Sequence, residues 1–210
     1  MAVLTISRQF GAGGKTLAQN IAARLNYDIA SEAIIEELAE RAKVEYYKLK
    51  SFEVEDTHLF SKSPGVFSPK QFIDRIFDPK KKYMDGKLYV DLLKQILPTI
   101  AEKDNLIILG RGAQFILKGA PKTYHILMVA EEKDRIQFMV DTYGLSMEDA
   151  GRTVRQQGKR RLKLMKLFDS EDFDLPRHYS LVLNMSKISM ATAEDLVCDL
   201  VDPAKVCTIA

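Results

Sequence analysis

The residues with the clearest chemical potential lie near the N-terminus, in the run SRQFGAGGKT at positions 7–16. A short β-prone apolar run, Val3 to Ile6, precedes the glycines, and apolar residues at helical spacing follow them as far as Leu25. A strand, a glycine turn and a helix N-terminus in this order direct several backbone N–H groups at one point, where the helix dipole also favours negative charge. Glycines let the backbone approach a polyphosphate without Cβ clashes. The run therefore predicts a site for nucleotide phosphates.

Two registers of a phosphate-binding loop fit this run. In the first, residues 14–16 form the G-K-[ST] end of a Walker A motif, in which the lysine reaches the β- and γ-phosphates and the hydroxyl holds Mg²⁺. The full motif requires a glycine where this chain has Gln9. In the second register, residues 11–13 form the G-x-G before the lysine, glycine stands at the lysine position, and Arg8 or Lys15 supplies the charge. The candidate cofactor-binding residues are Arg8, Gly11, Ala12, Gly13, Gly14, Lys15 and Thr16, with Thr16 as the metal ligand.

Two other interpretations of the glycine run fit less well. The run could be a strand-to-helix connection that binds no ligand, but packing alone would not require four consecutive small residues there. A dinucleotide-binding turn requires G-x-G-x-x-G and an acidic residue at the end of the second strand, and neither is present.

Further along the chain, apolar strands alternate with helical periodicity. We expect strands near 106–109, 124–129 and 179–185, and helices near 88–101, 131–141, 147–168 and 192–200. Pro98 should kink the first of these helices or end it. Ser146 should be the N-cap of the third, with Asp149 three residues later as in a variant of the capping box. Such alternation predicts one α/β domain over residues 1–210, a three-layer P-loop NTPase fold with about five parallel strands and helices on both faces.

Two later basic elements could bring charge to the same edge of the sheet. Arg111 follows the strand at 106–109, and ligands bind at the carboxyl ends of strands in open α/β sheets. An arginine there suits bidentate contact with a phosphate, although a surface loop would also accept one. A basic cluster on the helix after Ser146 is expected either to fold over a transferring phosphoryl group or to form a solvated or nucleic-acid-binding face. Its members are Lys159, Arg160, Arg161, Lys163 and Lys166.

Composition limits the class of protein. The 210 residues carry a formal net charge of +2, which does not demand nucleic acid or an anionic membrane. The two cysteines, Cys198 and Cys207, have no metal-ligand spacing with the three histidines, and we expect inert thiols in a reducing compartment. No apolar run approaches the roughly 18–20 residues of a membrane span. A cytoplasmic location is the expectation.

Taken together, these segments resemble the cytidylate kinase-like family. The resemblance rests on ISRQFGAGGKTLA, LIILGRGAQFIL, YGLSMEDA, GKRRLKLMKLF and YSLVLNMSKIS, which span nearly the whole chain in this order. It implies an ATP- and Mg²⁺-dependent kinase whose partners are small nucleotide substrates, and it leaves a homodimer open. It also implies that residues 45–85 form a monophosphate-binding insertion and that residues 146–178 form a lid.

The resemblance assigns roles to individual residues. The loop from Gly11 to Thr16 would hold the donor triphosphate, and Arg111 matches the arginine of a G-R-D turn that binds the acceptor monophosphate. Arg161, with Arg160 beside it, matches the lid arginine. The implied catalytic residues are therefore Lys15, Arg111, Arg160 and Arg161.

Four acidic residues of the family pattern are replaced in this chain. The residues that stand in their place are Gly112 in the G-R-D turn, Gly158 before the lid arginine, Ser31 after the second strand, and Ser180 in the Y-D-L near the last strand. Phosphate binding survives these replacements, whereas cytidine specificity and catalysis depend on what compensates for them.

Three functions follow from the sequence. The leading one is phosphoryl transfer from ATP to a nucleoside monophosphate, with CMP or dCMP as acceptor. The alternatives are a catalytically degenerate nucleotide-binding regulatory protein and a kinase of another small acceptor. A nucleic-acid-binding role would rest on the basic cluster alone.

Overall fold

The computed structural model describes residues 2–30, 34, 36, 86–168 and 172–201. The expected insertion at 45–85, Ser31 and Cys207 lie outside these residues, as do three residues of the expected lid at 169–171. Every helix among the described residues is too short or too polar to cross a bilayer.

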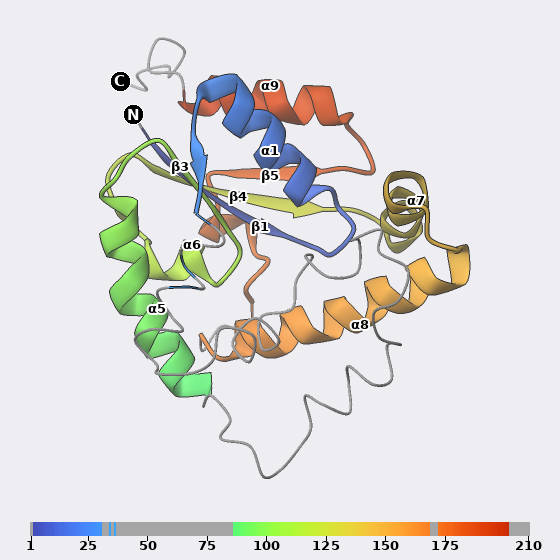
Figure 1. Ribbon diagram of the computed structural model, residues 1–210, viewed down its shortest axis with the longest axis horizontal. Helices are drawn as coiled ribbons and strands as arrows, with labels where there is room; N and C mark the ends of the chain where they lie inside the picture. The colour runs from blue at the N-terminus through green and yellow to red at the C-terminus, as the bar shows by residue number, and fades with distance from the viewer. Residues whose placement is uncertain (1, 31–33, 35, 37–85, 169–171, 202–210) are drawn as a thin grey trace.

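Five parallel strands form one sheet in the order β2-β3-β1-β4-β5, which confirms the predicted fold class (Figure 1). The strands are β1 (Val3–Arg8), β2 (Asp28–Ile29), β3 (Leu106–Leu109), β4 (Thr123–Val129) and β5 (Leu181–Asn184). Strand β1 lies in the centre with neighbours on both sides, which explains why five of its six residues are buried.

Helices cover both faces of the sheet and its carboxyl edge. They are α1 (Gly14–Leu25), α5 (Gly86–Ala101), α6 (Ala113–Ile116), α7 (Glu132–Tyr143), α8 (Met147–Lys166), the 3₁₀ helix η1 (Pro176–His178) and α9 (Met190–Val201). Helices α1 and α9 lie on one face, and α5 and α6 on the other. Figure 1 shows α8 extending from α7 toward α5, across the end of the sheet where the glycine turn lies.

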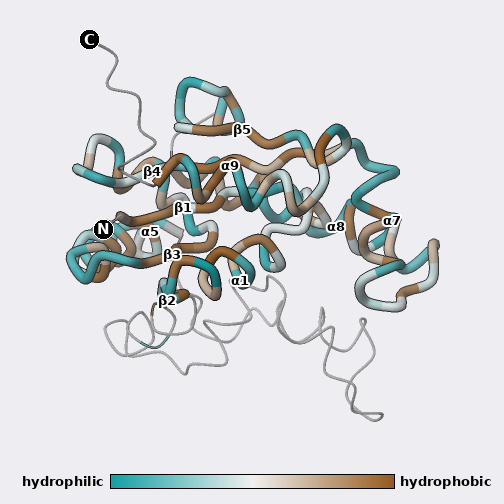
Figure 2. The backbone as a smooth tube through the Cα atoms, turned by 90° about the horizontal axis from the view of Figure 1, so that it is seen from above, coloured by the Kyte–Doolittle hydropathy of each residue, from teal (hydrophilic) through white to brown (hydrophobic). Residues whose placement is uncertain are grey.

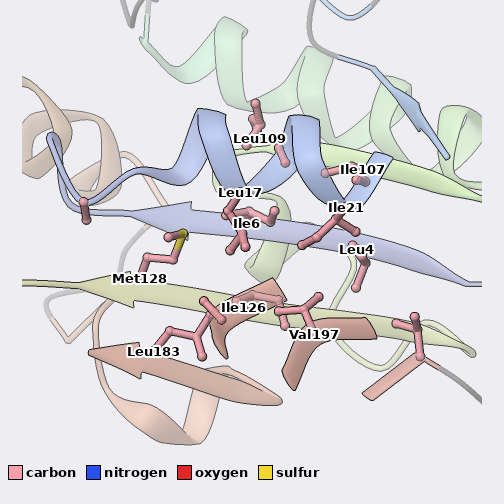
Figure 3. Close-up of a cluster of buried hydrophobic side chains, with 14 of the residues drawn as sticks. Leu4, Ile6, Leu17, Ile21, Ile107, Leu109, Ile126, Met128, Leu183 and Val197 are labelled. Atoms are coloured by element: carbon pink, nitrogen blue, oxygen red, sulfur yellow. The ribbon is translucent and has the colours of Figure 1, made fainter. Parts of the chain in front are cut away.

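The core is divided by the alternation of side chains along β1. Leu4 and Ile6 point toward α1 and α9, where they meet Leu17, Ile21 and Val197 (Figure 3). The tube in Figure 2 shows the same concentration of apolar residues along the central strands. Burying this apolar surface fixes the end of β1 and the start of α1, and so positions the turn between them.

The opposite face of β1 carries polar residues that bond within the sheet layer. The Thr5 hydroxyl lies 2.7 Å from Nδ1 of His125 on β4, and both side chains are buried. Burial lowers the pKa of the His125 imidazole below its ordinary value. The backbone N–H of His125 donates a hydrogen bond to the Ser180 hydroxyl at 3.1 Å, which fixes the chain leading into β5.

Most predicted elements are confirmed within a few residues, and the capping prediction for α8 is confirmed in detail. The Ser146 hydroxyl accepts a hydrogen bond from the Asp149 N–H at 3.1 Å and donates one to the Asp149 carboxylate at 2.8 Å. We expected Pro98 to kink or end α5, but the helix continues through it to Ala101. A proline so close to the C-terminus of a helix leaves only one carbonyl without its partner. The short elements β2, α6 and η1 were not predicted.

Candidate functional site

The glycine turn adopts a backbone conformation that strongly favours glycine. Gly11 and Gly13 have φ angles of +84° and +83°, and Gly13 is the N-cap of α1. A Cβ on Gly11 would lie 2.8 Å from the carbonyl oxygen of Arg135, so the turn also needs glycine there for space. Gly14, Lys15 and Thr16 form the first turn of α1.

Four consecutive amide groups at this turn have no carbonyl partner among the described residues. The first bond of the helix runs from the Leu17 N–H to the Gly13 carbonyl at 2.9 Å, which leaves the N–H groups of residues 13–16 without a backbone acceptor. No acidic side chain occupies the first turn of α1. The positive end of the helix dipole and these N–H groups together make a site with the electrostatics of an anion receptor.

Gln9, at the start of the turn, helps to fix the shape of the turn through hydrogen bonds to the end of β4. Gln9, where the Walker A motif has glycine, donates its N–H to the Met128 carbonyl at 2.9 Å and accepts the Ala130 N–H on its side-chain oxygen at 3.1 Å. Both bonds tie the start of the turn to the end of β4. The Gln9 side chain therefore makes a hydrogen bond with the segment after β4 that a glycine could not make.

Phe10 anchors the turn to the helical hairpin α7–α8. Its side chain is 8% exposed and packs with Met139 of α7 and with Ala150 and Val154 of α8. The turn is thus held from two directions, by the end of β4 and by the hairpin α7–α8.

Arg135 on α7 lies beside the turn and was not singled out from the sequence. Its guanidinium donates to the Phe10 carbonyl at 3.3 Å and to the Ala130 carbonyl at 3.1 Å. Burial lowers the pKa of Arg135, and the neighbouring charge of Arg161 lowers it further. In the described part of the chain no carboxylate pairs with it. A single arginine in a helical stretch carries no sequence signal that would have revealed this position.

Arg161, the expected lid arginine, is buried at the base of the turn. Its two terminal nitrogens donate to the two carboxylate oxygens of Asp174 at 2.8 and 2.6 Å, and one of them also donates to the Ser7 hydroxyl at 3.0 Å. The guanidinium carbon lies 4.9 Å from the centre of the Phe173 ring. Asp174 was not singled out from the sequence, although it supplies an acid for Arg161 in a chain whose residue 158 is glycine.

A polar cluster continues from Ser7 beneath α8. Buried Gln114 donates to the Tyr179 hydroxyl at 3.3 Å, and that hydroxyl donates to the Phe173 carbonyl at 2.7 Å. Burial raises the pKa of the Tyr179 phenol. These bonds fix the segment that carries Asp174 against the carboxyl end of β1.

The arginine turn after β3 has an unusual backbone. Gly110, Arg111 and Gly112 have φ angles of +68°, +57° and +64°, so three consecutive residues are left-handed. The Gly110 N–H donates to the Ile6 carbonyl at 2.9 Å, which joins the turn to β1. Arg111 is partly exposed at the carboxyl edge, as predicted from its place after the strand.

Arg160 differs from its neighbour Arg161. Its side chain is half-buried, burial lowers its pKa, and it makes no hydrogen bond or ion pair with any part of the chain that the structure describes. The three lysines of the basic cluster are exposed to solvent: Lys159, Lys163 and Lys166. Its two arginines differ from them and from each other, because Arg160 is half-buried and Arg161 is buried.

Comparisons with known proteins agree with this architecture. No curated protein matches the chain in sequence. The crystal structure of an uncharacterized protein from Eubacterium ventriosum is similar over 96% of this chain and 98% of its own, with a TM-score of 0.65 and 18% identity. Shikimate kinase from Bacteroides thetaiotaomicron is similar over 95% and 97% of the two chains, with a TM-score of 0.48 and 11% identity.

The sheet order and the glycine turn after the central strand are those of a P-loop NTPase fold, and the Eubacterium ventriosum protein shares this chain's architecture over nearly its whole length. The model of one protein family matches residues 3–187, nearly the whole chain. The chain therefore belongs to the cytidylate kinase-like family.

Proposed function

We propose that this protein is a kinase that transfers the γ-phosphoryl group of ATP to a nucleoside monophosphate, with CMP or dCMP as the first acceptors to test. The observation that carries the proposal is the row of four amide groups, residues 13–16, at the N-terminus of α1. Membership of the cytidylate kinase-like family supports the reaction class.

The residues of the turn fit a triphosphate donor. The glycine conformation, the amide row and the absence of acid in the first turn of α1 all favour a polyanion. Lys15 would neutralise the β- and γ-phosphates, and the Thr16 hydroxyl would hold Mg²⁺, a cation that commonly keeps several waters and the substrate phosphates among its ligands. When bound, Mg²⁺ neutralises phosphate charge. The described residues contain no cluster of three acidic, histidine or cysteine ligands, so the phosphates themselves would be its main partners.

The chain's own residues would position and neutralise charge, which is the main requirement of phosphoryl transfer. Arg8, whose stem lies against Gly14, and Lys15 are the candidates at the donor. Arg111 and Arg160 are the candidates at the acceptor. Arg161 is paired with Asp174, so its role would be to hold α8 against the base of the turn.

That ion pair also favours a second function. Because Asp174 neutralises Arg161, the expected lid arginine has no free charge for a transition state. A protein that binds a nucleotide for regulation, without transferring its phosphoryl group, would tolerate this arrangement. A kinase of another small acceptor would instead replace the missing acidic groups with other contacts to its substrate.

Two substitutions with a matched control test the proposal. ATP affinity and diphosphate formation from CMP, dCMP, UMP and AMP are measured for the wild type, Lys15→Ala, Arg111→Ala and Lys103→Ala. Lys103 lies in the turn before β3, at the opposite edge of the sheet. We expect Lys15→Ala to weaken ATP binding, Arg111→Ala to weaken use of the acceptor more than ATP binding, and Lys103→Ala to change neither.

The outcomes separate the candidate functions. ATP binding without diphosphate formation from any monophosphate favours the regulatory protein. Slow ATP turnover that only a pool of non-nucleotide metabolites accelerates favours another small acceptor. Equal and negligible effects of Lys15→Ala and Arg111→Ala would contradict the site itself.

A further inference from the structure

Gln157 is a buried polar side chain without a partner. The residue is 5% exposed, and its side-chain oxygen Oε1 accepts no hydrogen bond from any part of the chain that the structure describes. Native structures rarely keep a buried acceptor without a donor unless there is a reason for it. The neighbouring positions on α8 indicate what that reason is.

The printed contacts of α8 locate Gln157 over the carboxyl edge of the sheet. One turn earlier, Val154 packs with Phe10 of the glycine turn, and one turn later Arg161 bonds to Ser7. Because residues three and four apart share a helix face, Gln157 faces the end of β1 between these two contacts.

The same helix face leads to the arginine turn after β3. Phe168, two residues past the end of α8, lies against Gly112, next to Arg111. Gln157 thus lies on a face of α8 that contacts the glycine turn through Val154, and the segment just past the helix reaches the arginine turn.

Arg160 is the second polar residue of this region without a partner. It follows Gln157 by one turn, is half-buried, and bonds to nothing in the described ranges of the chain. A half-buried cation calls for an anion, whereas the Gln157 oxygen calls for a hydrogen-bond donor. An ionised phosphate alone offers only acceptors, so it can satisfy Arg160 but not Gln157 Oε1.

We propose that Gln157 and Arg160 read the acceptor substrate, which is a phosphate monoester that also carries an amine or hydroxyl donor. Arg160 binds the phosphate, and Gln157 Oε1 accepts a hydrogen bond from the base or the sugar. This inference rests on the proposed function and deepens it, because it assigns recognition of the acceptor to a residue of α8 that is not an arginine. A binding site that pairs a substrate donor with a buried acceptor discriminates strongly against analogues that lack the donor.

Calorimetric titration of CMP, UMP, AMP and ATP into Gln157→Met tests the assignment. Methionine keeps the volume and removes the acceptor, and Gln156→Met is the matched control because Gln156 is its exposed neighbour. We expect Gln157→Met to weaken the best monophosphate about tenfold, to flatten the ranking among monophosphates, and to leave ATP affinity unchanged. Gln156→Met should change none of these affinities.

A second pair of variants separates the phosphate contact from the donor contact. We expect Arg160→Gln to weaken all monophosphates by about tenfold or more while keeping their ranking, with Lys159→Gln as the exposed control. Ranking lost in Gln157→Met but kept in Arg160→Gln would support the separate roles.

Three results would overturn the inference. The first two leave the proposed function standing, whereas the third contradicts both. Wild-type affinities in Gln157→Met, with raised thermal stability, would mean that Oε1 faces only a buried water. Unchanged monophosphate binding in Arg160→Gln would remove the phosphate contact. A wild-type protein that binds ATP but no monophosphate would overturn the proposed function together with this inference.

Discussion

The ring of Phe168 fills the space that a side chain on residue 112 would need. A Cβ built on Gly112 would lie 2.7 Å from Cε1 of this ring, and Gly112 has a φ of +64°. The segment directly after α8 therefore lies on the arginine turn that follows β3. An aspartate at position 112, as in the G-R-D pattern of the family, would require the Phe168 ring to move and would strain a left-handed backbone.

Substitution of Gly112 should destabilise the protein through two effects. We expect Gly112→Ala to lower the free energy of unfolding by about 2–5 kcal/mol, from left-handed backbone strain and from the clash with Phe168. Urea denaturation measures the loss. Gly119→Ala is the control, because Gly119 has a φ of +77° but nothing lies within 4 Å of its Cβ position. Equal losses in both variants would show that the clash is absent.

The Arg161–Asp174 pair should matter more for stability than an exposed pair. The Arg161 side chain is 8% exposed and the Asp174 side chain 30%, so Asp174→Asn would leave a buried cation uncompensated. We expect a loss of about 2–4 kcal/mol in the free energy of unfolding, reduced by the partial exposure of Asp174. Asp172→Asn, which breaks an exposed pair with Arg177, should cost less than about 0.5 kcal/mol. Similar losses for the two variants would contradict a buried role for Arg161.

The buried imidazole of His125 should make stability depend on pH. Because burial lowers its pKa in the folded state, the unfolded chain binds more protons below its ordinary pKa of about 6.5. Stability should therefore fall as the pH drops below about 6.5, by up to about 1.4 kcal/mol per pH unit. Unfolding measured between pH 5 and 8 tests this, with His125→Gln expected to flatten the dependence over the lower part of that window, below about pH 6.5. An unchanged pH profile in His125→Gln would assign the effect to other groups.

Phe10 should couple the glycine turn to α7 and α8. We expect Phe10→Ala to cost about 3–5 kcal/mol in stability and to weaken ATP binding, because the turn loses its anchor. Met139→Ala is the matched control, since Met139 belongs to the same cluster but not to the turn. It should lose stability while keeping its ATP affinity. If both variants bind ATP as tightly as the wild type, the anchor does not set the conformation of the turn.

The parts of the structure that were predicted from the sequence have strong local signals. The apolar run of β1, the glycines after it and the periodicity of α1 sufficed to predict the strand, the turn and the helix, because each depends on local residue types. The N-cap at Ser146 was predicted for the same reason. The four-residue helix α6 and the two-residue strand β2 are too short for periodicity to develop.

The residues that were missed depend on contacts distant in sequence. Asp174 is recognisable only through its bonds to Arg161, and Arg135 only through its contact with Phe10. Gln157 has no motif around it, and its significance comes from burial without a partner. The role of Gln9, which departs from the Walker A pattern, likewise depends on a contact with Ala130, more than 100 residues away in the sequence.

Whether the amides of the glycine turn bind polyphosphate is measured most directly by NMR titration of the ¹⁵N-labelled protein with Mg²⁺–ATP. We predict that the amide signals of Gly13 to Thr16 shift most, that Lys15→Ala reduces the affinity without moving the site, and that inorganic triphosphate produces the same pattern at this turn. Shifts confined to other segments, with these four signals unchanged at saturating ATP, would contradict the account.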